Sequence, residues 1–256
     1  MDFLGLMSDQ LKLVVGFDIG TAYSSVSFAL APINGSQSQT NNARGVSTQE
    51  SMPVSFNGRY QVSSQLAWCS EGSNWTWGDY IDVLVDDGRV DESDRIQMLK
   101  MCLEGSSRTQ RIRDKLHILI SRLPHAAKEQ LMTPTAPEAG DLIGMYLKLL
   151  WTETRTQIMG HYAKSNAGNI FDYCPVESWI SIPKLWSPQI NAIMVAAADW
   201  AGIPDIHLVH EPEAAAALCL LEQYEHALRY GQLAAASMQG IHAGVSCRYR
   251  PSLSPD

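Results

Sequence analysis

Residues 11–30 read LKLVVGFDIGTAYSSVSFAL, two apolar segments joined by a short turn. The first segment, from Leu11 to Ile19, is a short apolar run of the kind that forms a buried strand. In the second segment, from Ser24 to Leu30, apolar and small residues alternate, which predicts a half-buried antiparallel strand. We therefore expect a tight hairpin whose tip spans residues 20–23.

Further along the chain, turn signals and apolar spacing predict more strands and then helices. Asn57-Gly58 between two short apolar segments suits a type I′ hairpin turn over residues 54–62, and residues 75–81 suggest another short strand. Residues 31–51 are polar and predict a surface loop. Apolar residues at three- and four-residue intervals predict helices over 93–103, 108–123 and 142–158.

The last third of the sequence alternates strands with helices. We expect strands at 179–182 and 206–209, a helix that opens at Ser187-Pro188 and runs to Gly202, and an alanine-rich helix over 213–230. Strand-helix-strand-helix order implies parallel pairing. The predicted fold is α/β: a ribonuclease-H-like lobe, as in actin-like ATPases, with a mixed sheet and a helical and β insertion at about 52–165.

Composition narrows the function classes. The 256 residues include 45% hydrophobic positions and carry a net charge of -8, which disfavours a general nucleic-acid surface. The basic stretch from Arg108 to Lys115 is a local exception, read either as a solvated helix face or as a phosphate-binding patch.

No apolar run is long enough for a membrane span, and the N-terminus lacks the charge pattern of a secretion signal. Five widely spaced cysteines suggest reduced thiols. We expect a cytoplasmic protein.

The predicted hairpin tip is the strongest chemical signal. Gly20 lets backbone amides approach an anion, and Thr21 offers a hydroxyl to the same group. Asp18, at the end of the strand, could hold Mg²⁺ through its water ligands. An ordinary tight turn is the alternative interpretation.

A second signal is HEPEAAAA at residues 210–217. Glu211 falls between a parallel strand and the next helix, at the sheet edge where α/β folds bind ligands. A carboxylate there could orient a metal-bound water. Alternatively, Glu211 and Glu213 complement the helix dipole while the alanines pack against the sheet.

Both segments, with WISIP at 179–183 and AAADWAGI at 196–203 between them, resemble the nucleotide-binding domain of the seventy-kilodalton heat-shock chaperones, the DnaK-like family. The family usually has Thr at the positions of Ala22 and Glu213. The latter difference, with WTWG at 75–78, is more similar to a divergent eukaryotic branch.

The resemblance implies ATP and Mg²⁺ as cofactors. If the resemblance holds, Asp18 positions the hydrated metal. The terminal phosphates then lie against the residues of the hairpin tip, namely Gly20, Thr21, Ala22 and Tyr23. Glu211 helps to order the attacking water, which displaces ADP from the γ-phosphate. The nearest candidate for the family's lysine near this water is Lys100, for which an exposed helix lysine is the alternative.

The family's second lobe would open with a strand that ends in Asp and a glycine-rich loop, and residues 231–256 show no such motif. We therefore expect residues 1–230 to form the first lobe and residues 231–256 to form a disordered tail. One lobe leaves most of the nucleotide in water, so we expect weak or undetectable ATP binding.

Two other function classes stay open. The lobe could be a non-catalytic scaffold that binds a protein partner, which an exposed apolar face on residues 213–230 would favour. It could also be a small-molecule kinase or a nuclease, although a two-metal nuclease needs more carboxylates than Asp18 and Glu211.

Overall fold

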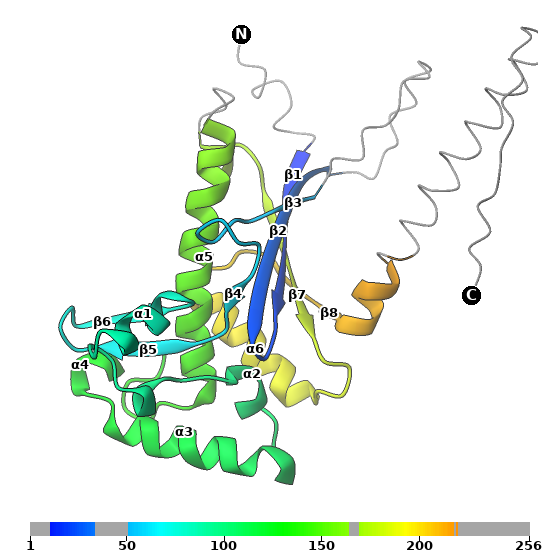
Figure 1. Ribbon diagram of the computed structural model, residues 1–256. Coiled ribbons are helices and arrows are strands. Elements are labelled where there is room, and N and C mark those ends of the chain that lie inside the picture. The colour runs from blue at the N-terminus through cyan, green and yellow to red at the C-terminus, as the bar shows by residue number, and fades with distance from the viewer. Residues whose placement is uncertain (1–10, 34–50, 164–168, 218, 220–256) are drawn as a thin grey trace, which may run out of the picture. The chain divides into compact units, whose positions relative to one another are not determined.

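A mixed six-stranded sheet organises the chain in the computed structural model, which describes residues 11–33, 51–163, 169–217 and 219. The strand order is β3-β2-β1-β7-β8, and β4 also pairs with β2 (Figure 1). These strands are β1 (Leu11–Ile19), β2 (Tyr23–Pro32), β3 (Met52–Pro53), β4 (Val62–Ser63), β7 (Val176–Ile182) and β8 (Ile206–His210).

The directions of the strands match the sequence pattern. β1 and β2 pair antiparallel up to Ile19 and Ser24, so the turn spans four residues, as expected. β1 then pairs in parallel with β7, and β7 with β8. The predicted α/β class with a mixed sheet is confirmed.

Contacts divide the chain into two units, Met1–Glu211 and Pro212–Asp256. The sheet, its insertion and the residues of the candidate sites belong to the first unit. In the second unit, residues 212–217 are helical, which agrees with the expected start of the alanine-rich helix. The remainder of that helix, its proposed apolar face and the expected boundary at residue 230 lie outside the described residues.

One face of the sheet builds the core. Alternate β1 side chains Leu13, Val15 and Phe17 are buried, and the ring of Phe17 meets Trp151 of α5 (Ala139–Ala163) edge to face. α5 is the long helix beside the sheet in Figure 1. The predicted helix over 142–158 is therefore confirmed and extends further at both ends.

A second helix, α6 (Pro188–Trp200), packs on α5 at small residues. A Cβ added to Gly144 would come within 3.2 Å of the Trp200 ring, so glycine lets the two helices approach closely. The Ser187 side chain accepts a hydrogen bond from the Ile190 amide and caps α6, as the Ser-Pro pair predicts. The helix ends at Trp200 rather than at Gly202.

The predicted insertion between the sheet strands contains a small second sheet and several short helices. The sheet pairs β5 (Leu66–Cys69) with β6 (Asn74–Trp77). The helices of this region are α1 (Tyr80–Asp86), η1 (Glu92–Asp94), α2 (Leu99–Cys102), η2 (Ser107–Thr109), α3 (Gln110–Arg122) and α4 (His125–Lys128). A further short helix, η3 (Ile170–Asp172), follows α5. The helix predicted over 108–123 corresponds to η2 and α3.

The helix predicted over residues 93–103 is wrong for most of its length. Ile96 and Leu66 exchange two backbone hydrogen bonds of 2.8 and 2.9 Å, which holds this segment extended beside β5. Met98 then takes a left-handed conformation with φ of 56°, and only α2 follows it as a helix. Pairing with another strand has overridden the local helical spacing.

Of two smaller predictions, one needs correction and the other is confirmed. The strand expected over 75–81 ends at Trp77, because Gly78 turns the chain with φ of 69° and α1 begins at Tyr80. At the Asn57-Gly58 turn both residues have positive φ, as type I′ requires. Phe56 and Arg59 pair antiparallel across this turn through two backbone hydrogen bonds of 2.6 and 3.0 Å, so the predicted hairpin turn is confirmed. The nearby strands β3 and β4 pair with β2 rather than with each other.

Remaining expectations concern the polar loop, the cysteines and the membrane. Residues 31 and 32 still belong to β2, and residues 34–50 lie outside the described part. The thiols of Cys69, Cys102, Cys174 and Cys219 are free, and Cys247 is outside the described residues. Within the described ranges, none of the helices combines the length and apolar character that a bilayer crossing requires.

Candidate phosphate and magnesium site

The hairpin tip has the tight geometry that the sequence predicts. A Cβ added to Gly20 would lie only 2.2 Å from the backbone oxygen of Tyr23, so the turn depends on glycine. Thr21, Ala22 and Tyr23 are exposed, and the Ala22 carbonyl accepts a hydrogen bond from the Ser64 amide. The tip is therefore anchored from one side and open on the other.

Asp18 lies one residue before the end of β1 and is exposed. The hydroxyl of Ser181, its neighbour on β7, donates a 2.7 Å hydrogen bond to Asp18 Oδ1. This contact fixes the carboxylate and leaves its other oxygen available. Such a carboxylate can accept hydrogen bonds from water molecules around Mg²⁺.

Lys100 and Glu211 contact each other directly. The Lys100 ammonium of α2 forms an ion pair with Glu211, which follows the last residue of β8. The Lys100 side chain is only 6% exposed, and its ammonium lies 5.6 Å from the centre of the Trp186 ring. The exposed-lysine interpretation is wrong.

The strand register brings both carboxylates to one edge of the sheet. Asp18 pairs with Ser181 across β1 and β7, and Ser181 pairs with Val209 across β7 and β8. Glu211 comes two residues after Val209, at the same carboxyl edge. Two strand spacings amount to about 10 Å, a span that a hydrated magnesium ion and a phosphate group can bridge.

Buried polar atoms at this edge have free hydrogen-bonding capacity. Within the described residues, His210 Nδ1 and Trp186 Nε1 are both inaccessible to solvent and have no hydrogen-bond partner. His210 directly precedes Glu211, and Trp186 lies against Lys100. These two inaccessible nitrogens do not reach a ligand at the surface, and the Gly20 turn with the exposed Asp18 carboxylate is the part of the edge that fits a phosphate group with its metal and ordered water.

A cavity of about 310 Å³ adjoins the hairpin tip. Thr21, Ala22 and Tyr23 line one part of it, and the insertion supplies the rest of the lining, namely Ser63, Ser64, Gln65, Asp82, Arg95, Gln97 and Met98. None of these insertion residues was predicted from the sequence as a site residue. The segments that carry these residues are short or irregular, and the backbone bridge between Ile96 and Leu66 brings two of them together.

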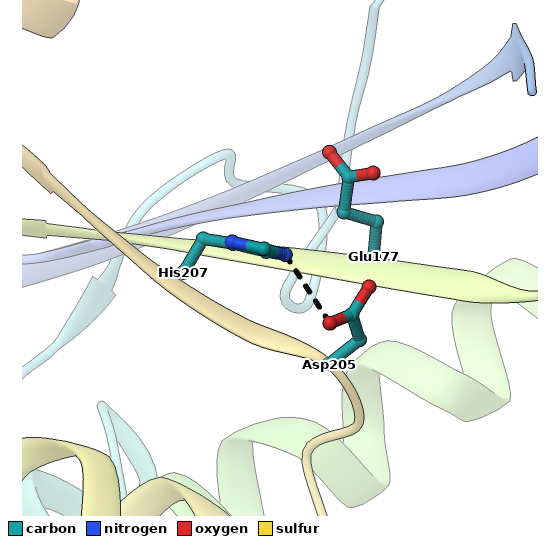
Figure 2. Close-up of side chains that lie close together, drawn as sticks. All are labelled: Glu177, Asp205 and His207. Atoms are coloured by element: carbon teal, nitrogen blue, oxygen red, sulfur yellow. Dashed lines mark ion pairs between the residues drawn. The ribbon is translucent and has the colours of Figure 1, made fainter. Parts of the chain in front are cut away.

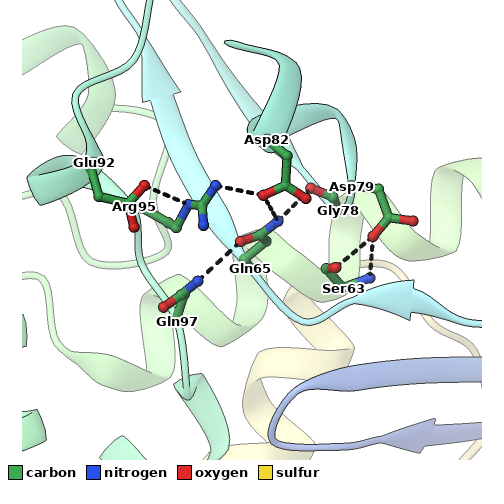
Figure 3. Close-up of polar contacts among 8 residues, drawn as sticks. All are labelled: Ser63, Gln65, Gly78, Asp79, Asp82, Glu92, Arg95 and Gln97. Carbon is green, nitrogen blue, oxygen red and sulfur yellow. Dashed lines mark hydrogen bonds and ion pairs between the residues drawn. The ribbon is translucent and has the colours of Figure 1, made fainter. Parts of the chain in front are cut away.

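Figure 3 shows how hydrogen bonds and ion pairs hold this wall. Gln65 Nε2 donates to the Gly78 carbonyl at 3.0 Å, and Gln97 Nε2 donates to Gln65 Oε1 at 3.3 Å. Arg95 forms ion pairs with Asp82 and Glu92. The wall is polar and its charges are largely paired, so it can face an anion without repelling it.

A separate group of metal-ligating side chains lies at the opposite, amino edge of the sheet (Figure 2). One ligand atom from each of Glu177, Asp205 and His207 falls within 4.8 Å of the others. Glu177 already forms an ion pair with Lys12 and accepts a 2.6 Å hydrogen bond from Trp179 Nε1. These two contacts lower the pKa of Glu177 below its ordinary value. Glu177, Asp205 and His207 therefore belong to an ion-paired network that includes Lys12.

Comparison with known proteins gives no assignment. No protein-family model matches the chain, and no curated protein matches it. The function below therefore depends on the residues and their geometry.

Proposed function

We propose that this chain binds the phosphates of ATP and ADP together with Mg²⁺, as the first lobe of an actin-like ATPase related to the seventy-kilodalton heat-shock chaperones, in the cytoplasm. The supporting observation is the ion pair between Lys100 and Glu211 at the sheet edge that also carries Asp18. The sequence predicted each of these two residues separately as a site residue, although they lie 111 positions apart in the chain. A buried lysine is rare without a partner, so their contact supports a shared role.

Each side chain has a task that its position allows. The tip, with Gly20 and the Thr21 hydroxyl, holds the terminal phosphate. Asp18, fixed by Ser181, orients water molecules on the metal side. Glu211 accepts a hydrogen bond from the attacking water, and Lys100 provides positive charge near the phosphate. Bound Mg²⁺ supplies charge neutralisation on the phosphate oxygens.

Two features of the chain limit the proposed activity. Ala22 lacks the hydroxyl that the family usually has at this position and cannot donate a side-chain hydrogen bond to phosphate. The described cavity lining surrounds only the tip and its neighbouring wall. Because few nucleoside contacts offset the entropic cost of association, we expect weak binding and slow hydrolysis.

Titration calorimetry with Mg²⁺–ATP and Mg²⁺–pyrophosphate tests this proposal. Since the proposed contacts reach the phosphates and not the nucleoside, we expect both ligands to bind weakly and with similar affinity. Asp18→Asn should abolish binding of both, whereas Asp199→Asn, at an exposed position of α6, should not. Absence of binding to the unmodified chain would refute the function. Much tighter binding of ATP than of pyrophosphate would refute its restriction to the phosphates.

A further inference from the structure

A second cavity of about 290 Å³ lies between α3 and the extended segment around Ile96. Its walls are largely apolar and include Ile96, Cys102, Leu116 and Leu119, all of which are buried side chains. It shares Arg95, Gln97 and Met98 with the cavity beside the hairpin tip. Its size is near the lower end of typical ligand pockets, which indicates a small ligand.

Two unpaired cations stand at the opening of this cavity. Arg111 and Lys115, four residues apart on α3, both line it and are exposed. Neither forms an ion pair with any residue that the structure describes. Arg113, between them, does not line the cavity and instead donates to the Glu104 carbonyl and to Gln110.

The lining of this cavity is also free of negative charge. Among the described residues that form it there is no Asp or Glu, although the whole chain carries a net charge of -8. Burial raises the pKa of the Cys102 thiol to about 11, so this side chain stays neutral and acts as an apolar surface. An apolar interior beneath two free cations is complementary to an anion that has an apolar body.

We propose that this cavity binds a small amphipathic carboxylate, with its hydrocarbon part against Ile96 and Leu116 and its carboxylate between Arg111 and Lys115. Burial of the hydrocarbon supplies most of the affinity, at about 25 cal/mol per Å² of apolar surface. The two cations supply selectivity for the anion. This assignment is independent of the proposed nucleotide site. It gives Arg111 and Lys115, within the basic stretch 108–115, a role in anion binding in place of a solvated helix face.

Calorimetric titration with decanoate tests the assignment, with decanol and decylammonium as probes of equal chain length. We expect decanoate to bind more tightly than decanol, and decylammonium to bind more weakly than decanol because the two cations repel its ammonium group. The double variant Arg111→Gln/Lys115→Gln should weaken decanoate binding about tenfold, as expected for two partly exposed ion pairs, and leave decanol binding unchanged. Arg108→Gln, which removes a cation from the same stretch but not from the cavity, is the matched control.

Three results would overturn the assignment: no decanoate binding by the unmodified chain, equal binding of decanoate and decanol, or full decanoate affinity in the double variant. Circular dichroism should show the same helix content in all variants, because Arg111 and Lys115 are exposed. Leu119→Trp gives a second test, since the larger side chain should fill the cavity and exclude decanol and decanoate alike. Retention of both ligands by a folded Leu119→Trp variant would place their binding elsewhere.

Discussion

Lys100 of α2 forms an ion pair with Glu211, which lies beyond the end of β8, and the two side chains differ greatly in exposure. Lys100 is 6% exposed, whereas Glu211 is 45% exposed. The buried ammonium therefore depends on the glutamate, but the glutamate can be hydrated without the lysine. This asymmetry predicts unequal effects of the two single substitutions.

Glu211→Gln should lower the free energy of unfolding by about 1–3 kcal/mol, because it leaves the Lys100 charge buried without its partner. Lys100→Met should cost less, since it removes the buried charge. The double variant Lys100→Met/Glu211→Gln should be more stable than Glu211→Gln alone. Urea unfolding of the four proteins measures the coupling. Additive losses would show that the pair does not contribute.

The turn at Gly20 predicts a strong effect of one methyl group. Gly20→Ala places a Cβ 2.2 Å from the Tyr23 backbone oxygen, so the turn must move, and we expect a loss of about 1–3 kcal/mol in stability. Gly16→Ala, in the preceding strand β1, has its nearest neighbour, Ser27 Oγ, at an ordinary 3.5 Å and serves as the control. Thermal unfolding compares the two, and equal stability would contradict the turn geometry.

The backbone conformation of Met98 predicts that the substitution Met98→Gly stabilises the protein. It is a non-glycine residue with φ of 56°, a conformation that costs roughly 1 kcal/mol for most L-residues. Because its side chain is 45% exposed, Met98→Gly loses little packing and should raise the urea midpoint. Met101→Gly, within α2, should lower it, since glycine costs about 1 kcal/mol inside a helix. The opposite order would contradict the left-handed conformation at Met98.

The buried thiol of Cys102 predicts a loss of stability at high pH. Its pKa rises from 9.0 to about 11 on folding, through burial, so above pH 9 the unfolded chain releases this proton while the folded chain retains it. Stability should therefore decline between pH 9 and 11, by on the order of 1 kcal/mol from this group. Cys102→Ala should flatten that decline, and urea unfolding at several pH values measures it. An unchanged slope would contradict the burial of the thiol.

The sequence predicted the central strands well because their apolar alternation is local. β1, β2, β7, β8 and the capped start of α6 all follow from spacing and turn residues within a few positions. The sequence failed around residue 96, where a backbone bridge to Leu66 holds the chain extended. That pairing joins segments 30 positions apart, and no periodicity within either segment reports it.

Some residues of the candidate site could also be predicted from the sequence, and others could not. Asp18 and Glu211 could be placed at one edge from the sequence, because parallel strands bring their carboxyl ends together. Gln65, Arg95 and Gln97 could not, because they reach the cavity from irregular segments of the insertion. The burial of Lys100 was also not predictable, since it depends on how α2 packs near Trp186.

The most direct test of the phosphate and magnesium site is a two-dimensional ¹⁵N NMR titration of the chain with Mg²⁺–ATP at millimolar concentrations, which detects weak binding residue by residue. We predict that the backbone amide signals of Gly20, Thr21, Ala22 and Tyr23 shift on titration, and that Asp18→Asn abolishes these shifts. Unchanged signals at the hairpin tip, or shifts that persist in Asp18→Asn, would contradict a nucleotide-phosphate site at this edge of the sheet.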